Sequence, residues 1–440
     1  MRRVLCPVEN LYVAQRSRAV LSCVLDGPVD RAALSAAFDA VTAEQPQLRT
    51  RIVPDGDGDG GGDSGGHALE PLPEAEWPRL LTRTGGEEAY LEEANTPLTV
   101  GGPLTRAVLV TDPDCDARRH TLVLSVDHVV TDGHSGITLL NTLWDRYREL
   151  VEGTEGTEGT EGAEAARPPV AAFAEPISTL LPPADPADTA NHRDQRAGDV
   201  ARHPVELVPY DVKPTEEEPE EPHRIEVQRL RLDTAPTAGL RARARTEGVS
   251  VHALISAALL LAARRRMDGA EPRLLGCTSP VDLRSRLTPP VSAALMIPAV
   301  SMNLQTLPVG KETDILDLAR QVGDGLREFL DRGDHFREMR IMPSARRYPT
   351  LHLGTVIVTN MGAVSGPRLP AGTRVTDVRL VPGREHYFPQ LGRSPILACV
   401  TTFDGRLAIE FPHHTACYSR LFMRELADEV HATLLALAGS

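Results

Sequence analysis

The chain has 440 residues, of which 41% are hydrophobic and 4% aromatic, and its formal net charge at pH 7 is −14. This length exceeds what one hydrophobic core usually needs and favours two domains. The negative charge disfavours sequence-independent binding to nucleic acid or to an anionic membrane, and the low aromatic content argues against base-stacking surfaces.

The N-terminal residues MRRVLCPVENLYVAQ do not resemble an export signal, because Pro7, Glu9 and Asn10 interrupt the apolar run. No stretch approaches the roughly 20 uninterrupted apolar residues of a membrane span. We therefore expect a cytoplasmic protein. The scattered cysteines form no CxxC pair, and we expect them to be reduced, mostly buried and not part of a metal site; they are Cys6, Cys23, Cys115, Cys277, Cys399 and Cys417.

The first half alternates predicted strands and helices. Residues 18–27 (RAVLSCVLDG) predict a strand, and residues 30–46 (DRAALSAAFDAVTAEQP) a helix capped by Asp30. Residues 120–126 (HTLVLSV) predict a buried strand, and residues 133–150 an amphipathic helix.

The second half repeats this alternation, which favours α/β sandwich domains. Residues 250–266 (SVHALISAALLLAARRR) predict a buried helix capped by Ser250, and residues 352–360 (HLGTVIVTN) predict a strand. Residues 396–411 predict a hairpin that turns at Asp404-Gly405, and residues 419–437 a closing amphipathic helix.

Two segments are too polar to pack. One is PDGDGDGGGDSGG, residues 54–66. The other begins with the tandem repeat EGTEGTEGTEGAEA and continues through acidic, proline-rich sequence, and such segments cannot offset their ordering entropy by burial. We therefore predict an N-terminal domain over residues 1–151, a flexible linker over residues 152–223 and a C-terminal domain over residues 224–440.

The stretch SVDHVVTDGHSG, residues 125–136, places His128 between two aspartates at a strand-to-helix junction. A histidine is the side chain best suited to remove a proton near neutral pH, and Gly133 allows backbone or substrate to approach closely. The structural alternative is a half-buried histidine followed by Asp132 as a helix N-cap. A nucleophilic Ser135 is not indicated, because the stretch lacks the G-x-S-x-G spacing.

Residues 127–133 (DHVVTDG) resemble the HHxxxDG motif of the CoA-dependent acyltransferase superfamily. Segments similar to other motifs of that family occur in the family's order over nearly the whole chain. These segments are EQPQLRTRI (44–52), SPVDLRSRLTP (279–289), MNLQTLPV (302–309), VTNMG (358–362) and FDGRLAIEF (403–411). The stand-alone length and the stretch DGHSGITLLNTLWDRY (132–147) resemble the polyketide-associated branch more than a module of a large synthetase.

The resemblance implies two chloramphenicol-acetyltransferase-like α/β sandwich domains with a tunnel between them. It also implies that His128 is the general base and that Asp132 pairs with Arg49. Asn360 is the candidate donor to the oxyanion, and the structural alternative is a turn residue before Gly362. Asp127 departs from the family, because it replaces the first histidine of the motif and could raise the pKa of His128 if the two side chains met; strand alternation points them apart.

The implied activity is transfer of an acyl group from a thioester, either acyl-CoA or an acyl carrier protein, to a hydroxyl acceptor. The resemblance implies no permanently bound cofactor, and we expect a monomer. Two alternatives remain at this point: an amide-forming condensation enzyme that uses the same base, and a catalytically silent relative that docks carrier proteins.

Overall fold

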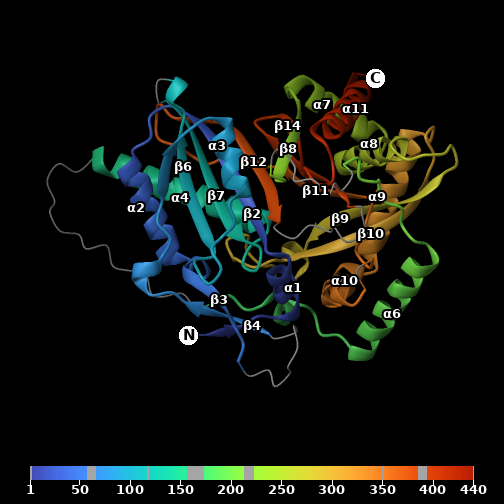
Figure 1. Cartoon of the computed structure of the whole chain (residues 1–440), viewed down its shortest axis with the longest axis horizontal. Coiled ribbons are helices and arrows are strands. Elements are labelled where there is room, and N and C mark those ends of the chain that lie inside the picture. Colours follow the sequence, from blue (N-terminus) through green and yellow to red (C-terminus); the bar gives the residue numbers. More distant parts are fainter. Residues whose placement is uncertain are drawn as a thin grey trace. The chain divides into compact units, whose positions relative to one another are not determined.

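The structure is a computed structural model that describes residues 2–56, 66–115, 118–155, 173–212, 222–348, 350–384 and 394–439. The chain divides into two compact units, and each unit contains a large β-sheet (Figure 1). The first unit comprises residues 1–180, 291–299 and 365–385, and the second comprises residues 181–290, 300–364 and 386–440. The predicted mixed α/β class is confirmed.

The large sheet of the first unit has the strand order β12-β2-β7-β6-β5 among the described residues (Figure 1). Strand β2 is buried along nearly its whole length and pairs antiparallel with both β7 and β12. A smaller sheet has the order β1-β4-β3. The strands are β1 (Arg3–Val4), β2 (Ser17–Asp26), β3 (Thr50–Pro54), β4 (His67–Pro71), β5 (Leu81–Thr84), β6 (Thr105–Thr111), β7 (Arg119–Asp127) and β12 (Arg374–Arg384).

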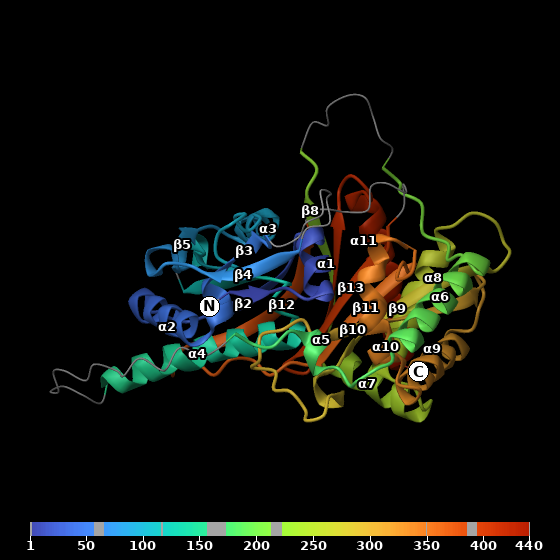
Figure 2. The ribbon, with the colours of Figure 1, turned by 90° about the horizontal axis from the view of Figure 1, so that it is seen from below.

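Helices α2 and α4 pack together on one face of this sheet, and α3 lies on the other (Figure 2). Asp30 caps α2 by accepting hydrogen bonds from the backbone of the first turn, as the sequence predicts. Helix α4 approaches β2 closely, because a Cβ on Gly136 would lie only 3.0 Å from Leu21. The helices are α1 (Pro7–Gln15), α2 (Arg31–Glu44), α3 (Glu87–Asn95), α4 (Gly133–Glu155) and α5 (Ile177–Leu180).

The sheet of the second unit has the order β10-β9-β11-β13-β14-β8 among the described residues. The predicted hairpin joins β13 and β14, and Asp404 (φ 49°) and Gly405 (φ 73°) both adopt the left-handed conformation that a two-residue turn requires. The strands are β8 (Ile225–Leu232), β9 (Arg273–Asp282), β10 (Val300–Val309), β11 (Val356–Ala363), β13 (Ile396–Phe403) and β14 (Arg406–His414).

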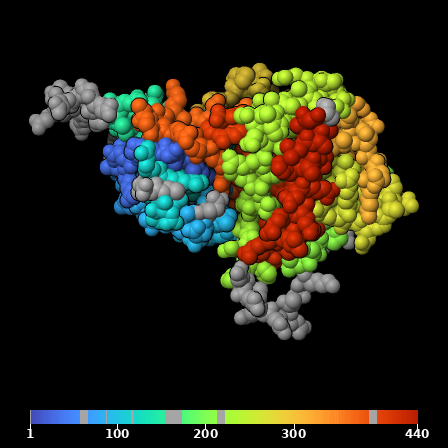
Figure 3. Space-filling model, turned by 90° about the horizontal axis from the view of Figure 1, so that it is seen from above, coloured from blue at the N-terminus to red at the C-terminus, as the bar shows by residue number. Residues whose placement is uncertain are grey.

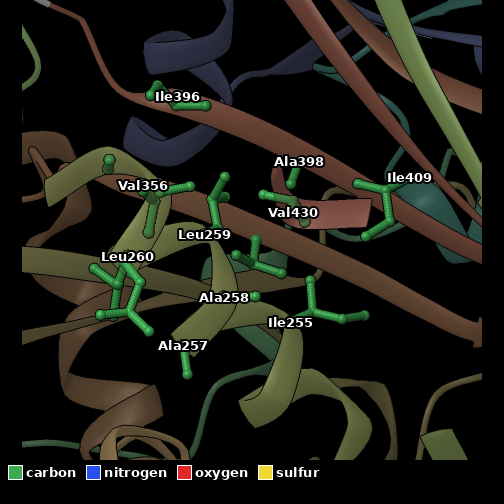
Figure 4. Packing of buried hydrophobic residues seen from close by; sticks show 14 of the residues in the cluster. Ile255, Ala257, Ala258, Leu259, Leu260, Val356, Ile396, Ala398, Ile409 and Val430 are labelled. Carbon is green, nitrogen blue, oxygen red and sulfur yellow. The ribbon is translucent and has the colours of Figure 1, made fainter. Parts of the chain in front are cut away.

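The core of the second unit forms around the predicted helix α8, which is buried on most of its surface and capped by Ser250. Its side chains meet residues of β11, β13, β14 and α11 (Figure 4). The closing helix α11 lies beside α7 and shows its outer face at the surface (Figure 3). The helices are α6 (Pro186–Arg202), α7 (Thr234–Thr246), α8 (Val251–Arg265), α9 (Ile315–Asp331), α10 (Asp334–Ile341) and α11 (Arg420–Gly439).

We predicted an unstructured linker over residues 152–223. This prediction is wrong for the part of the segment that the structure describes. Helices α5 and α6 lie within it, and α6 buries no residue. Polar contacts hold α6 instead: His192 (2.9 Å) and Arg196 (2.8 Å) both reach the buried carboxylate of Glu338 on α10. Residues 57–65, 156–172 and 213–221, which include most of the PDGDGDGGGDSGG segment and most of the tandem repeat, lie outside the described residues.

The division of the chain also differs from the predicted one, because β12 comes from the C-terminal part of the chain and completes the sheet of the first unit.

Within the described residues, no single helix is long and apolar enough to cross a membrane. The helices α7 and α8, which form a sharply bent pair, pass that test of length and composition only when they are counted together. Five of the six cysteines are free and buried, as expected.

Candidate active site

His128 follows the last residue of β7 and is fixed by backbone contacts. Its N–H donates to the carbonyl of Ser17, the first residue of the neighbouring strand β2, at 2.9 Å. Its ring Nδ1 lies 3.0 Å from the carbonyl oxygen of Thr131. Because a carbonyl only accepts, this contact places the proton on Nδ1 and leaves Nε2 with the lone pair that a general base needs.

The side chains around His128 keep its ring neutral. Burial and the positive charge of Arg384 lower the pKa of His128 to about 4, although the Thr131 carbonyl and the charge of Asp132 act in the opposite direction. The ring is therefore unprotonated near pH 7 and can accept a proton.

Tyr12 and Arg384 are two site residues that sequence reasoning missed. The ring of Tyr12, on α1, stacks on that of His128 with a centroid distance of 5.1 Å and an angle of 13°. Arg384 ends β12 and pairs in register with Ser17, whose carbonyl holds the His128 N–H. No local sequence pattern marks either residue, because strand pairing and helix packing create both contacts.

Asp132 is the N-cap of α4. Its Oδ1 accepts from the N–H of Ser135 at 3.0 Å, and its own N–H donates to Ser135 Oγ at 3.0 Å, which is a reciprocal capping arrangement. Its Oδ2 accepts from the N–H of Ala299 at 2.9 Å. Gly133 is the first residue of the helix. The carboxylate therefore fixes the turn that carries His128, and Ser135 serves the cap.

The structure does not bring Arg49 to Asp132. The Arg49 guanidinium carbon lies 4.9 Å from the ring centroid of Trp77, and among the described residues the carboxylate of Asp132 receives backbone and hydroxyl donors instead. The predicted pairing is therefore not met. The pairing fails for a local reason. Arg49 is the last residue of a short 3-10 helix before β3, and its guanidinium lies over the ring of Trp77.

Asp127 does not meet the ring of His128. Its Oδ1 accepts from the N–H of Val129 at 2.9 Å, and its side chain lines a pocket that does not include His128. The acidic group that acts on the pKa of His128 is Asp132. The pKa of His128 is therefore low although an aspartate occupies the position of the first motif histidine.

Asn360 lies in the second unit, on β11. Its Oδ1 accepts from the N–H of Gly362 at 2.8 Å, and Gly362 has a left-handed φ of 66°. The side chain thus stabilises a bulge in β11, and its NH₂ group remains the part that can donate. Among the described residues no group of histidine, cysteine and acidic side chains could hold a metal ion.

Known proteins are similar to this chain over most of its length. Residues 221–412 match the family model described as phthiocerol/phthiodiolone dimycocerosyl transferase C-terminus. A phthiocerol/phthiodiolone dimycocerosyl transferase of Mycobacterium sp. (strain JLS) is 26% identical over 389 residues, which cover 86% of this chain and 85% of that protein. One from Mycobacterium leprae (strain TN) is 25% identical over 94% of this chain and 92% of that protein. The chain is an acyltransferase.

The fold of this acyltransferase agrees with the assignment. Polyketide synthase associated protein 5 from Mycobacterium tuberculosis has a TM-score of 0.73 at 22% identity, over 99% of this chain and 98% of that one. The first condensation domain of the CDA synthetase has a TM-score of 0.71 at 18% identity, over 100% of this chain and 97% of that one. These two structures confirm the predicted fold class, and the matches to the transferase family model and to the transferase relatives confirm the predicted resemblance.

Proposed function

We propose that this acyltransferase moves an acyl group from a thioester to a hydroxyl group and so forms an ester, with His128 as the general base. The observation that carries the proposal is the neutral ring of His128, whose Nδ1 proton points to the Thr131 carbonyl and whose Nε2 is available to take a proton. The relatives named as dimycocerosyl transferases support a role in lipid or natural-product biosynthesis.

In the proposed reaction, Nε2 of His128 removes the hydroxyl proton while the oxygen attacks the thioester carbonyl. The tetrahedral oxyanion then collapses, the carbon–sulfur bond breaks, and the imidazolium returns the proton to the departing thiolate. No acyl-enzyme is required, because the base acts on the acceptor directly.

The other residues support this step. The cap formed by Asp132 and the start of α4 at Gly133 hold the turn in place, and Tyr12 fixes the plane of the imidazole by stacking. The NH₂ group of Asn360 is our candidate donor to the oxyanion. The donor is acyl-CoA or an acyl carrier protein, and no permanently bound cofactor takes part.

One assay tests the proposal. Purified protein is incubated with an acyl thioester and either an alcohol or an amine of the same carbon skeleton, and thiol release is followed together with the mass of the product. We expect an ester from the alcohol and a loss of at least about 10²-fold in rate for His128→Ala, the smallest contribution usual for a general base. An amide as the main product would establish the condensation alternative, and a folded protein that turns over neither acceptor would support a catalytically silent one.

A further inference from the structure

Three polar residues form one row across the large sheet of the first unit. Strands β12, β2 and β7 lie side by side (Figure 1), and Arg384 on β12 is directly opposite Ser17 on β2. On the other side of β2, Arg18 pairs with Asp127. The next residues, Ser17 and His128, therefore also oppose each other, and the N–H of His128 donates to the Ser17 carbonyl at 2.9 Å. We call Arg384, Ser17 and His128 the polar row; with about 4.8 Å between neighbouring strands, it spans about 10 Å.

The polar row lies on the face of the sheet that α4 covers. Directly opposite residues of an antiparallel pair point to the same face, and so do residues two apart along one strand. Leu21 on β2 approaches Gly136 of α4 closely, so Ser17, four residues before Leu21, also points to the α4 side. Arg384, opposite Ser17, does the same. The neighbouring Asp127 points to the other face.

Two members of the polar row have buried polar atoms without a partner. Ser17 is 0% exposed, and its Oγ has no hydrogen-bond partner within the described part of the chain. The Nε of Arg384 is buried as well, and the described residues offer its guanidinium neither a hydrogen bond nor an ion pair. Because an unpaired buried donor costs free energy, both side chains gain from a ligand that accepts hydrogen bonds.

The charge of Arg384 reaches the base. Together with burial, which is the larger cause, it lowers the pKa of His128 to about 4, and it partly offsets the rise to about 12 that burial gives the pKa of Tyr12. Asp132 is the acidic group that acts on both residues, but its carboxylate accepts backbone N–H groups. A base this weak is poorly matched to a reaction near neutral pH, and a ligand that neutralises Arg384 strengthens it.

The side chains of the polar row define the class of ligand. Ser17 and Arg384 both donate hydrogen bonds, and Arg384 adds one positive charge, so the ligand accepts hydrogen bonds and is anionic. A planar guanidinium fits a carboxylate with two parallel hydrogen bonds, and one positive charge balances one carboxylate rather than a phosphate dianion. The group at the other end of the row, at His128, is the hydroxyl of the acceptor. The carboxylate therefore belongs to the same molecule.

We propose that Arg384 and Ser17 bind a carboxylate of the acyl acceptor while its hydroxyl group reacts at His128. The acceptor is then a hydroxycarboxylic acid, and this substrate class rests on the proposed acyl transfer. The bound carboxylate neutralises Arg384, so His128 becomes a stronger base when the acceptor is in place.

Binding tests the proposal without turnover. A series of ω-hydroxycarboxylates of increasing length is compared by titration calorimetry with the hydroxyamides of the same skeleton, in which an uncharged NH₂ group replaces one oxygen. We expect the wild type to bind the best-fitting carboxylate at least about tenfold more tightly than its amide, the smallest effect usual for a hydrogen bond to a charged group.

Variants locate this preference. Arg384→Gln should lose it, Arg384→Lys should retain part of it, and Ser17→Ala should reduce it by about two- to tenfold, the range of a neutral hydrogen bond. The matched control is Arg374→Gln at the other end of β12, where the exposed arginine pairs with Asp26, and it should keep the wild-type preference. Circular dichroism confirms the fold of each variant.

Turnover distinguishes the acceptor from the donor as the source of the carboxylate. One pair of reactions compares kcat/KM for the hydroxycarboxylate and the hydroxyamide with a neutral acyl thioester. A second pair compares the mono-thioester of a dicarboxylic acid with the neutral thioester of the same length, both with a neutral alcohol. We expect the preference for the charged substrate in the first pair and its loss in Arg384→Gln.

The opposite results are equally clear. The proposal is overturned if the wild type shows no preference for the carboxylate, if Arg384→Gln and Arg374→Gln keep the same preference, or if only the charged thioester is preferred. Tighter binding of a hydroxyalkyl phosphate than of the carboxylate would also overturn it. Carboxylate binding that depends on Arg384, in a protein that transfers no acyl group, would refute the proposed function and retain the binding site.

Discussion

The pH dependence of the reaction gives the sharpest test of the site. Burial and Arg384 lower the pKa of His128 to about 4. Because kcat/KM reports the pKa of the free enzyme's base, its acidic limb should have an apparent pKa near that value. At pH 5.5, a base with a pKa of about 4 is still roughly 97% neutral, whereas a histidine at the ordinary value of 6.5 is roughly 9% neutral.

Arg384→Gln should move the acidic limb to higher pH, because removal of a positive charge makes the imidazolium easier to form. Its control is Arg374→Gln, at the other end of β12, where the exposed arginine pairs with Asp26 and should leave the limb unchanged. Thiol release is measured between pH 3 and 8, with circular dichroism at each pH.

The fold must be monitored because the same shift affects stability. An unfolded His128 takes up a proton as pH falls below about 6.5, but the folded one does so only near 4, so the stability that the neutral ring contributes is lost as pH falls through this window. A wild-type limb near 6.5 in folded protein, or no difference between the two arginine variants, would refute the assigned environment of the base.

Four further predictions concern single features. His128→Ala should abolish acyl transfer while thermal unfolding shows an intact fold, because the half-buried ring carries little of the core. Asp132→Asn should lower the unfolding free energy by about 1–3 kcal/mol and reduce kcat, because the NH₂ group of asparagine cannot accept the buried N–H of Ala299, and calorimetry checks the stability. Glu338→Ala should destabilise by about 3 kcal/mol and speed limited proteolysis within α6, because Arg196 loses its buried carboxylate partner and His192 loses a hydrogen-bond partner. Deletion of residues 156–163 should change the melting temperature little, because that sequence has no large apolar side chain and loop closure depends weakly on length; a large drop would contradict it.

Local signals predicted the elements that local chemistry determines. The cap at Asp30 fixed the start of α2, the cap at Ser250 that of α8, and Asp404-Gly405 the hairpin of β13 and β14. Helix α6 escaped prediction because it buries no residue, so it lacks the apolar periodicity by which helices are recognised, and its anchor Glu338 lies far away in sequence.

The site itself was predictable only in part. The DHVVTDG motif pointed to His128 and Asp132, but Tyr12 and Arg384 reach His128 through the pairing of β2 with β7 and β12 and through the packing of α1. Such contacts leave no mark in a single sequence. Arg49 was assigned to Asp132 by motif similarity, whereas its actual contact with Trp77 depends on the packing of the short helix before β3.

Strand β12 lies late in the sequence but completes the sheet of the first unit, and this has a consequence for synthesis of the protein. Strand β2 is buried and needs β12 on one side, yet β12 begins at Arg374, long after β2 has left the ribosome. At roughly 5–20 residues per second, translation from residue 180 to residue 384 takes about 10–40 s. During that time an apolar strand edge of the nascent first unit lacks its partner, and such edges template aggregation. A fragment ending at residue 180 should therefore need a chaperone or the separately supplied β12 segment to remain in solution, so the two units cannot be produced by cutting the gene at one point.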